Sequence, residues 1–162
     1  MRKFFYLWIS ILVIILDQIS KIIARNSIEL HQTIKVTEKF FWLTRVQNTG
    51  AGFSLSFGNL LVNRLIFIII PIIAVFIIIY LIKHSKSLIE IISFSLILGG
   101  ATGNLIDRII FGSVTDFIWW DFPDFIMERW PVFNIADSSI VAAICLLIIN
   151  SIFFSRKTVE EK

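Results

Sequence analysis

Charged residues are scarce in this chain. Asp, Glu, Lys and Arg make up 17% of its 162 residues, whereas about a quarter of the residues of a typical soluble domain are charged. Hydrophobic residues make up 57%, and the mean hydropathy is +0.85. Such a chain lacks the polar surface of a water-soluble globule or a disordered segment, so both classes are excluded.

Cysteine and histidine are also nearly missing. The single cysteine, Cys145, cannot form an internal disulfide, which excludes a disulfide-stapled secreted module. His31 and His84 are far apart and belong to no His-Glu-x-x-His motif, so the pattern of a zinc peptidase is missing. No hydrophobic run holds a histidine that could activate a serine nucleophile, and there is no phosphate-binding or dinucleotide-binding glycine motif.

Four long hydrophobic runs account for most of the chain. They cover residues 4–24, 65–82, 88–110 and 132–154, each close to the ~20 residues that a helix needs to cross a bilayer. The first run continues into Asp17 and Lys21 without a small-residue cleavage site, so we expect a retained helix. The sequence predicts an all-α membrane fold of four transmembrane helices in a single integral membrane domain, residues 1–162.

The basic residues predict the orientation of these helices. The net charge of +3 is interpreted as a topology signal and not as a nucleic-acid surface, because basic residues gather in the short cytoplasmic loops of membrane proteins. Their density is lower in the two long connections. We therefore expect both termini in the cytoplasm and residues 26–62 and 111–131 outside. Residues 33–46 are rich in β-branched and aromatic residues, which favours short strands, and a turn is expected at residues 48–52.

Polar residues inside the hydrophobic runs are the main functional signal, because an ionisable group there costs roughly 2.5–3.5 kcal/mol on insertion scales. Except for Glu90, they all lie toward the outer ends of the expected helices, which predicts one polar layer at that depth. The set is Asp17, Lys21, Glu90, Asn104, Asp107, Arg108, Asn134 and Asp137.

Two groups within this layer have both a structural and a functional interpretation. Asn104, Asp107 and Arg108 share one helical face, which fits either a packing seam with an ion pair involving Asp107 and Arg108 or a substrate site. Asn134 and Asp137 open the fourth hydrophobic run, where acidic residues cap helices. If that helix begins near residue 132, Asp137 lies too deep to serve as an ideal cap, which favours a further role.

Asp116 follows the third run in a segment that we expect to be a loop, and this segment allows it to meet Asp137. Two carboxylates in a poorly solvated site share a proton, so that one acts as a base on water while the other donates to a carbonyl. This pairing predicts aspartic-peptidase chemistry. The alternative is a transporter or assembly subunit with a structural polar network, although no repeat or midplane charge favours it.

Five short motifs then resemble those of the bacterial lipoprotein signal peptidase family, also called signal peptidase II. In chain order they are Asp17-Gln18-Ile19-Ser20-Lys21, Asn48-Thr49-Gly50-Ala51-Gly52-Phe53, the glycine-rich run 99–108 that ends in Asn104-Leu105-Ile106-Asp107-Arg108, Val114-Thr115-Asp116-Phe117, and Phe133-Asn134-Ile135-Ala136-Asp137. The resemblance covers nearly the whole chain.

The resemblance implies a role for each matched residue. Asp116 and Asp137 correspond to the catalytic pair, and Asp17, Lys21 and Asp107 to structural support. Positions that shape the site and bind the substrate backbone correspond to Asn48, Gly50, Asn104, Arg108 and Asn134. The implied fold adds a small extracytoplasmic β-cradle to the four helices.

The resemblance also implies the reaction and its setting. The implied substrates are diacylglyceryl-modified prolipoproteins in the bacterial cytoplasmic (inner) membrane, cut on the amino side of the lipidated cysteine at the extracytoplasmic face. No metal or organic cofactor is implied. Globomycin-type cyclic peptides are the implied inhibitors. The protein is expected to be surrounded by membrane lipid and to be a monomer.

Overall fold

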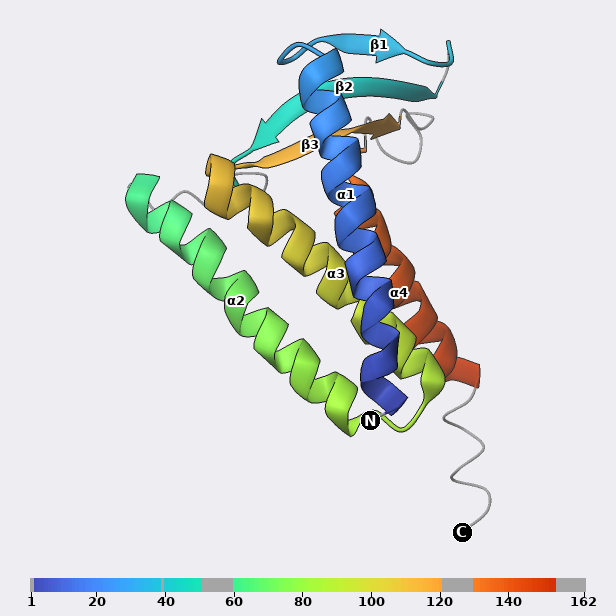
Figure 1. The fold of residues 1–162 in the computed structure, drawn as a ribbon. Helices are drawn as coiled ribbons and strands as arrows, with labels where there is room; N and C mark the ends of the chain where they lie inside the picture. Colours follow the sequence, from blue (N-terminus) through green and yellow to red (C-terminus); the bar gives the residue numbers. More distant parts are fainter. Residues whose placement is uncertain (1, 39, 51–59, 121–129, 154–162) are drawn as a thin grey trace.

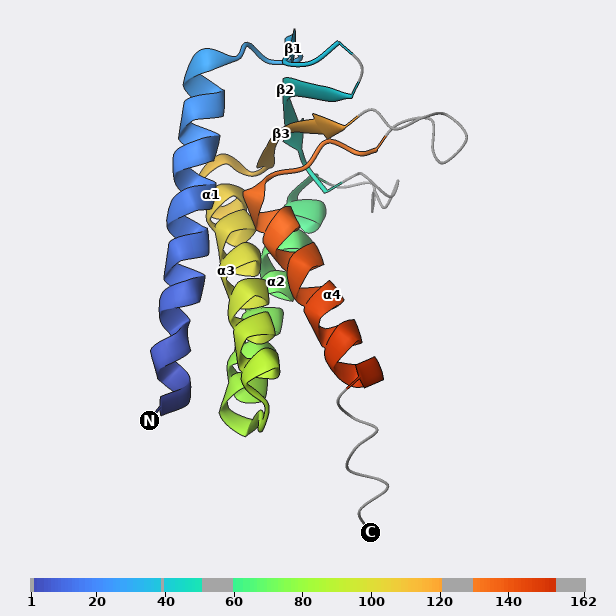
Figure 2. The same cartoon turned by 90° about the vertical axis from the view of Figure 1, so that its right-hand side faces the viewer.

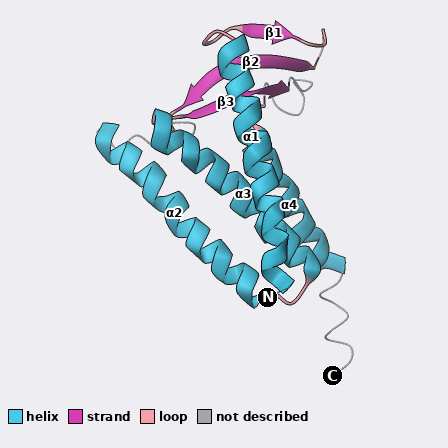
Figure 3. Ribbon diagram, viewed as in Figure 1, coloured by secondary structure: helices cyan, strands magenta, loops and turns pink. Residues whose placement is uncertain are grey.

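The structure, a computed structural model, describes residues 2–38, 40–50, 60–120 and 130–153. In this part of the chain, four long helices lie beside one another and a small sheet covers one end of them (Figures 1 and 3). We call this the sheet end. The elements are a 3₁₀ turn η1 (Arg2–Tyr6), α1 (Leu7–Ser27), β1 (Thr33–Lys35), β2 (Phe41–Asn48), α2 (Leu60–His84), α3 (Leu88–Phe111), β3 (Val114–Trp120) and α4 (Ile135–Phe153).

The four expected spans are confirmed as helices that are long and apolar enough to cross a membrane. Two boundaries differ from the prediction. The second helix begins at Leu60, five residues before the apolar run at 65. The fourth begins at Ile135 and not at 132, because the backbone of Phe133 pairs with Ile118 of β3 and is therefore extended.

Helix α3 is the centre of the bundle and packs against α1, α2 and α4. Its glycines permit this close packing. A Cβ atom on Gly99 would lie 2.7 Å from Cβ of Val13 in α1, and one on Gly100 would lie 2.5 Å from the carbonyl oxygen of Ala136 in α4. Small residues at these positions let the helices approach closely, so the packing interpretation of this part of α3 applies to its glycines. The outward faces of the helices carry exposed Ile, Leu and Phe side chains, as contact with lipid requires.

The sheet contains three antiparallel strands in the order β1-β2-β3. The strands expected in residues 33–46 are confirmed, whereas β3 forms in a segment that was expected to be a loop. Asn48 pairs in register with Val114, and Val46 with Asp116. Of the turn predicted at residues 48–52, positions 51 and 52 lie outside the described residues.

Both ends of the described chain lie at the same end of the bundle. Figures 1 and 2 show the start of η1 and the end of α4 at the end of the bundle that is opposite the sheet. Asp107 lies in the last turns of α3 and Asp137 in the first turn of α4, at the ends of these helices that are nearer the sheet, and Asp17, near the middle of α1, contacts that first turn of α4. All the polar residues predicted to form one layer, apart from Glu90, are therefore on the same side of the bundle.

The glycine seam generates a stability prediction. In Gly100→Ala, the added methyl group meets the Ala136 carbonyl and Ser139 Oγ, so α4 must move away from α3. We expect a loss of roughly 1–3 kcal/mol in the free energy of unfolding, measured by thermal unfolding in detergent. Ile109→Val, on the exposed side of the same helix, should leave the unfolding temperature unchanged. Equal stability of Gly100→Ala and the wild type would contradict the seam.

Candidate active site

A fully buried lysine joins α1 to α3. Lys21 Nζ lies 2.8 Å from Asp17 Oδ2 and 3.7 Å from Asp107 Oδ2, and none of the three side chains is exposed to solvent. Lys21 also donates a 2.8 Å hydrogen bond to Asn104 Oδ1. Asp17 Oδ1 in turn accepts a hydrogen bond from the backbone N–H of Ala136, which ties α1 to the first turn of α4.

One of the two interpretations of Asp107 and Arg108 is structural ion pairing, and Asp107 is ion-paired, although not with Arg108. Asp107 instead contacts Lys21 and Arg25, and it accepts a hydrogen bond from the backbone N–H of Thr115 at 2.9 Å. The Arg108 guanidinium lies over the ring of Phe67, 5.9 Å from its centroid. Adjacent positions on a helix point about 100° apart, so Asp107 faces α1 while Arg108 faces α2. Among the described residues, the buried Nε of Arg108 has no hydrogen-bond partner.

Two asparagines connect the buried charges to the two candidate carboxylates. Because Asn104 Oδ1 accepts from Lys21, its amide nitrogen is directed to Asp137 Oδ1, at 2.8 Å. The amide nitrogen of Asn134 donates to Asp116 Oδ1 at 2.6 Å and to Asn104 Oδ1 at 3.1 Å. Asn134 is completely buried, so the network is held away from solvent.

Asp137 is part of the cap of α4. Its backbone N–H donates to Asn134 Oδ1 at 3.0 Å, and its carboxylate Oδ2 accepts from the backbone N–H of Asn134 at 3.2 Å. This reciprocal pair has the geometry of a capping box. The prediction that Asp137 lies too deep for capping is wrong, because α4 begins at Ile135 and Asp137 is in its first turn. Capping uses only Oδ2, and Oδ1 accepts from Asn104.

Asp116 lies on β3 and is 3% exposed. Its Oδ1 accepts from Asn134, and its Oδ2 accepts from the amide of Asn48 on β2 at 3.1 Å. Burial raises the pKa of Asp116 to about 6, the nearby charge of Asp137 adds to this increase, and the hydrogen bonds from Asn48 and Asn134 oppose it. Asp116 is thus a carboxyl group that titrates close to neutral pH.

Asn48 is fixed by the residues that follow it. Its Oδ1 accepts a hydrogen bond from the backbone N–H of Gly50 at 2.9 Å. Gly50 has φ of +89°, and a Cβ atom there would lie 2.4 Å from the ring of Phe67. Both the backbone conformation and the lack of space therefore require glycine at this position.

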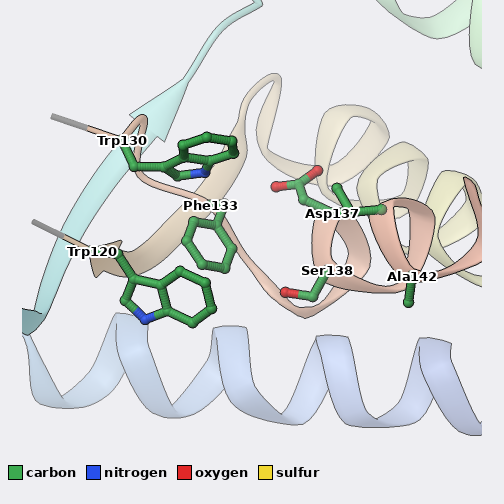
Figure 4. A pocket seen from close by; sticks show the side chains of 7 residues that line it. Trp120, Trp130, Phe133, Asp137, Ser138 and Ala142 are labelled. Atoms are coloured by element: carbon green, nitrogen blue, oxygen red, sulfur yellow. The ribbon is translucent and has the colours of Figure 1, made fainter. Parts of the chain in front are cut away.

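Asp116 and Asp137 thus both accept hydrogen bonds from Asn134, Asp116 from its side-chain amide and Asp137 from its backbone N–H. The sequence predicted that these two residues could meet. Beside them is an apolar cavity of about 450 Å³ lined by Trp120, Trp130, Phe133, Asp137, Ser138, Val141 and Ala142. Figure 4 shows the three aromatic side chains on one side of it and Asp137 and Ser138 on the other. In the described part of the chain, no cluster of His, Cys, Asp and Glu is suited to a metal ion.

Sequence reasoning missed two residues of this region, Arg25 and Gln18. Arg25 contacts Asp107 and Thr115, and Gln18 donates to the Gly103 carbonyl and the Asp107 carboxylate. A signal for Arg25 was present, because Asp17, Lys21 and Arg25 are spaced four residues apart and share one helical face.

Comparisons with known proteins agree with one another. The family described as "Signal peptidase (SPase) II" matches residues 9–153. A lipoprotein signal peptidase of Halothermothrix orenii is 41% identical over 142 residues, which cover 87% of this chain and 90% of the relative. One from Francisella tularensis subsp. novicida is 39% identical over 159 residues, covering 96% of each chain.

Solved structures show the same fold. One described as a bacterial membrane enzyme has a TM-score of 0.81 and 30% identity, covering 92% of this chain and 93% of its own. A second has a TM-score of 0.79 and 31% identity, covering 97% and 91%. The fold and these similarities define a multi-pass bacterial membrane enzyme of the aspartic peptidase class. Within that class, the chain belongs to the signal peptidase II family.

The buried carboxyl group of Asp116 generates a prediction about stability and pH. Its ordinary pKa is 3.8 and its pKa in the folded protein is about 6, so the folded state retains a proton that the unfolded state releases between these values. Asp116 therefore contributes stability that is complete below pH ~4 and is lost as the pH rises through ~6. The loss amounts to roughly 3 kcal/mol.

Thermal unfolding in detergent between pH 4 and pH 7 measures this loss. Asp116→Asn should lack this part of the pH dependence, whereas Glu29→Gln, which changes an exposed carboxyl group, should retain it. The same pH dependence in Asp116→Asn and the wild type would show that Asp116 is not the titrating group.

Proposed function

We propose that this chain removes the signal peptide from diacylglyceryl-modified prolipoproteins. In this proposal it cuts on the amino side of the lipidated cysteine, and Asp116 and Asp137 activate a water molecule without a metal or organic cofactor. The observation that carries the proposal is the pair itself: two carboxylates joined through Asn134 at one end of a transmembrane bundle, beside an apolar cavity. Membership of the signal peptidase II family supports the substrate class.

The surroundings of the two aspartates support different roles for them. Both aspartates accept N–H donors at each carboxylate oxygen, but only Asp137 lies in the first turn of a helix, α4, where the helix dipole favours negative charge. Asp116 is buried and its pKa is raised to about 6. We therefore assign the resting negative charge to Asp137 and the shared proton to Asp116.

These assignments define the first step of the reaction. Asp137 accepts a proton from water as the water oxygen attacks the carbonyl carbon of the scissile peptide bond. Asp116 donates its proton to the carbonyl oxygen, which gives a neutral tetrahedral gem-diol. In the second step, Asp137 gives its proton to the leaving amine while Asp116 recovers one from a hydroxyl group of the gem-diol. The peptide bond then breaks, and both carboxyl groups return to their starting states.

The depth of the site fits a lipid-bearing substrate. A lipidated cysteine is held at the membrane by its acyl chains, so its peptide bond must lie near the interface. The cavity beside Asp137 is lined almost entirely by apolar side chains of β3, α4 and the segment before α4, and it can accept an apolar part of the substrate.

The proposed orientation places the sheet end outside the cytoplasm and both termini inside. Lys3, Lys83 and Lys86 lie at the end opposite the sheet, which agrees with the enrichment of basic residues in cytoplasmic loops. The proposed location is the bacterial cytoplasmic membrane. A single chain supplies both aspartates, so we expect a monomer to be active and globomycin-type cyclic peptides to inhibit it.

Replacing either aspartate should remove cleavage. Asp116→Asn loses the proton donor and Asp137→Asn loses the base, so we expect each to lower turnover of a diacylglyceryl-modified prolipoprotein by a factor of at least ~10². Cleavage is followed on gels with purified protein, with a chelator in a parallel reaction. The chelator should have no effect.

Glu90→Gln is the matched control for these variants. Glu90 makes its contacts with the backbone at the start of α3, opposite the sheet end, so the same acid-to-amide change there should leave turnover near the wild-type rate. Near-normal cleavage by a folded Asp116→Asn or Asp137→Asn variant would reject the assigned pair. A folded wild type that cleaves nothing would favour the transport or assembly alternative.

Activity should depend on the planar guanidinium of Arg108 as well as on its charge. Its charge interacts with Asp137, Asp116 and Asp107, while its guanidinium lies over Phe67. Arg108→Lys keeps the charge but loses the planar fork and the stacking, so we expect kcat/KM to fall about 10-fold. Wild-type kcat/KM in this variant would show that charge alone is sufficient.

A further inference from the structure

The side chain of Arg25, near the end of α1, makes contacts that the proposed chemistry does not use. Its Nη1 atom lies 3.4 Å from each carboxylate oxygen of Asp107 and donates a 3.0 Å hydrogen bond to Thr115 Oγ1. The guanidinium also lies over the ring of Phe111, 4.4 Å from its centroid. One side chain of α1 therefore contacts both the last turns of α3 and the start of β3.

Thr115 is held at two atoms and directly precedes Asp116. Its hydroxyl oxygen accepts from Arg25, and its backbone N–H donates to Asp107 Oδ2 at 2.9 Å. Successive side chains of a strand point to opposite faces. Thr115 thus contacts α1 and α3 on one face, while Asp116 contacts Asn48 and Asn134 on the other.

The backbone of Arg25 is connected to the neighbouring strand. Arg45 of β2 donates from Nη1 to the carbonyl oxygens of Arg25 and Ile28, at 3.0 and 3.3 Å. The same strand carries Asn48, which donates to Asp116. Arg25 is therefore linked through its backbone to the strand of Asn48 and through its side chain to the strand of Asp116.

The charge of Arg25 alone does not explain these contacts. Lys21 already lies 3.7 Å from Asp107, so the carboxylate has a second cation beside it. The polar contacts of Arg25 are all made by the single atom Nη1, and an ammonium group also carries three N–H donors. A lysine at position 25 would keep the charge but lose the planar guanidinium that lies over Phe111 and sets the position of that nitrogen. Beyond its charge, this position therefore uses the planar shape of the guanidinium, which is packed on Phe111 while Nη1 contacts Asp107 and Thr115.

We propose that Arg25 is a positioning residue for the peptidase reaction, which acts through Thr115 to fix the start of β3 and the orientation of the Asp116 carboxyl group. This inference rests on the proposed function of Asp116. Arg25 itself contacts neither of the two aspartates assigned to the reaction in any hydrogen bond among the described residues.

Arg25→Lys, Thr115→Val and their double variant test the inference. Arg25→Lys should lower kcat about 10-fold with KM within about twofold of the wild type, because substrate contacts are kept while Asp116 is misplaced. Thr115→Val, which removes only the hydroxyl, should lower kcat by a smaller factor. The double variant should be no slower than Arg25→Lys, because residues that act through one contact are not additive.

Two further readouts separate positioning from a general loss of stability. Hydrogen–deuterium exchange of the backbone at residues 113–117 should become faster in Arg25→Lys, and the pH profile of kcat/KM should shift on the limb that Asp116 controls. Arg64→Lys is the matched control. Arg64 donates to the Ile109 carbonyl of α3 and lies beside Gly112, but it makes no hydrogen bond to β3 among the described contacts, so kcat and the pH profile should not change in that variant and exchange should change less than in Arg25→Lys.

Unchanged exchange at residues 113–117 together with wild-type kcat in Arg25→Lys would overturn the inference. Additive losses in the double variant would overturn the route through Thr115. If Arg25→Lys does not fold, Thr115→Val carries the same test, because it retains the ion pair with Asp107. A folded wild type that shows no cleavage would refute the proposed function instead, and the exchange data would still report whether Arg25 holds β3.

Discussion

The buried ammonium group of Lys21 is the interaction on which the rest of the structure depends. It is fully buried, and it compensates Asp17 and Asp107 while donating to Asn104. A buried charge is very costly without partners, so the helices that supply these partners must remain together. Asp17 and Asp107 extend the same network to the backbones of α4 and β3. One cation thereby links α1, α3, α4 and β3, which include the two elements that carry the candidate aspartates.

Asn134 connects this network of buried charges to both candidate aspartates. Its side chain donates to Asp116 and to Asn104, and its carbonyl oxygen Oδ1 accepts from the first turn of α4. Phe133, directly before it, pairs with β3. Strand pairing therefore acts on Phe133, and helix capping acts on the next residue, Asn134. These two adjacent residues connect β3, which carries Asp116, to the start of α4, which carries Asp137.

Much of this arrangement could be predicted from the sequence. Long apolar runs indicate spans, and the depth of Asp17, Asn104 and Asp137 along them indicates one polar layer, because polar residues in lipid need partners. Strand β3 was missed because Asp116 suggested a loop, although Val114 and Thr115 favour a strand. The partners of Asp107 and the start of α4 could not be predicted, because they depend on helix rotation and on the pairing of Phe133 with Ile118.

The cap of α4 has a consequence for turnover. The carboxylate of Asp137 both accepts the Asn134 N–H and, in the proposed reaction, receives the proton of water. Protonation removes the negative charge that the N-terminus of α4 favours, so the first turn of that helix is held less firmly during the lifetime of the tetrahedral intermediate. In the proposed cycle, the wall of the adjoining apolar cavity, which includes Ser138 and Val141 of α4, is therefore expected to be held less firmly while the tetrahedral intermediate exists, and firmly again once the peptide bond has broken and Asp137 has recovered its charge.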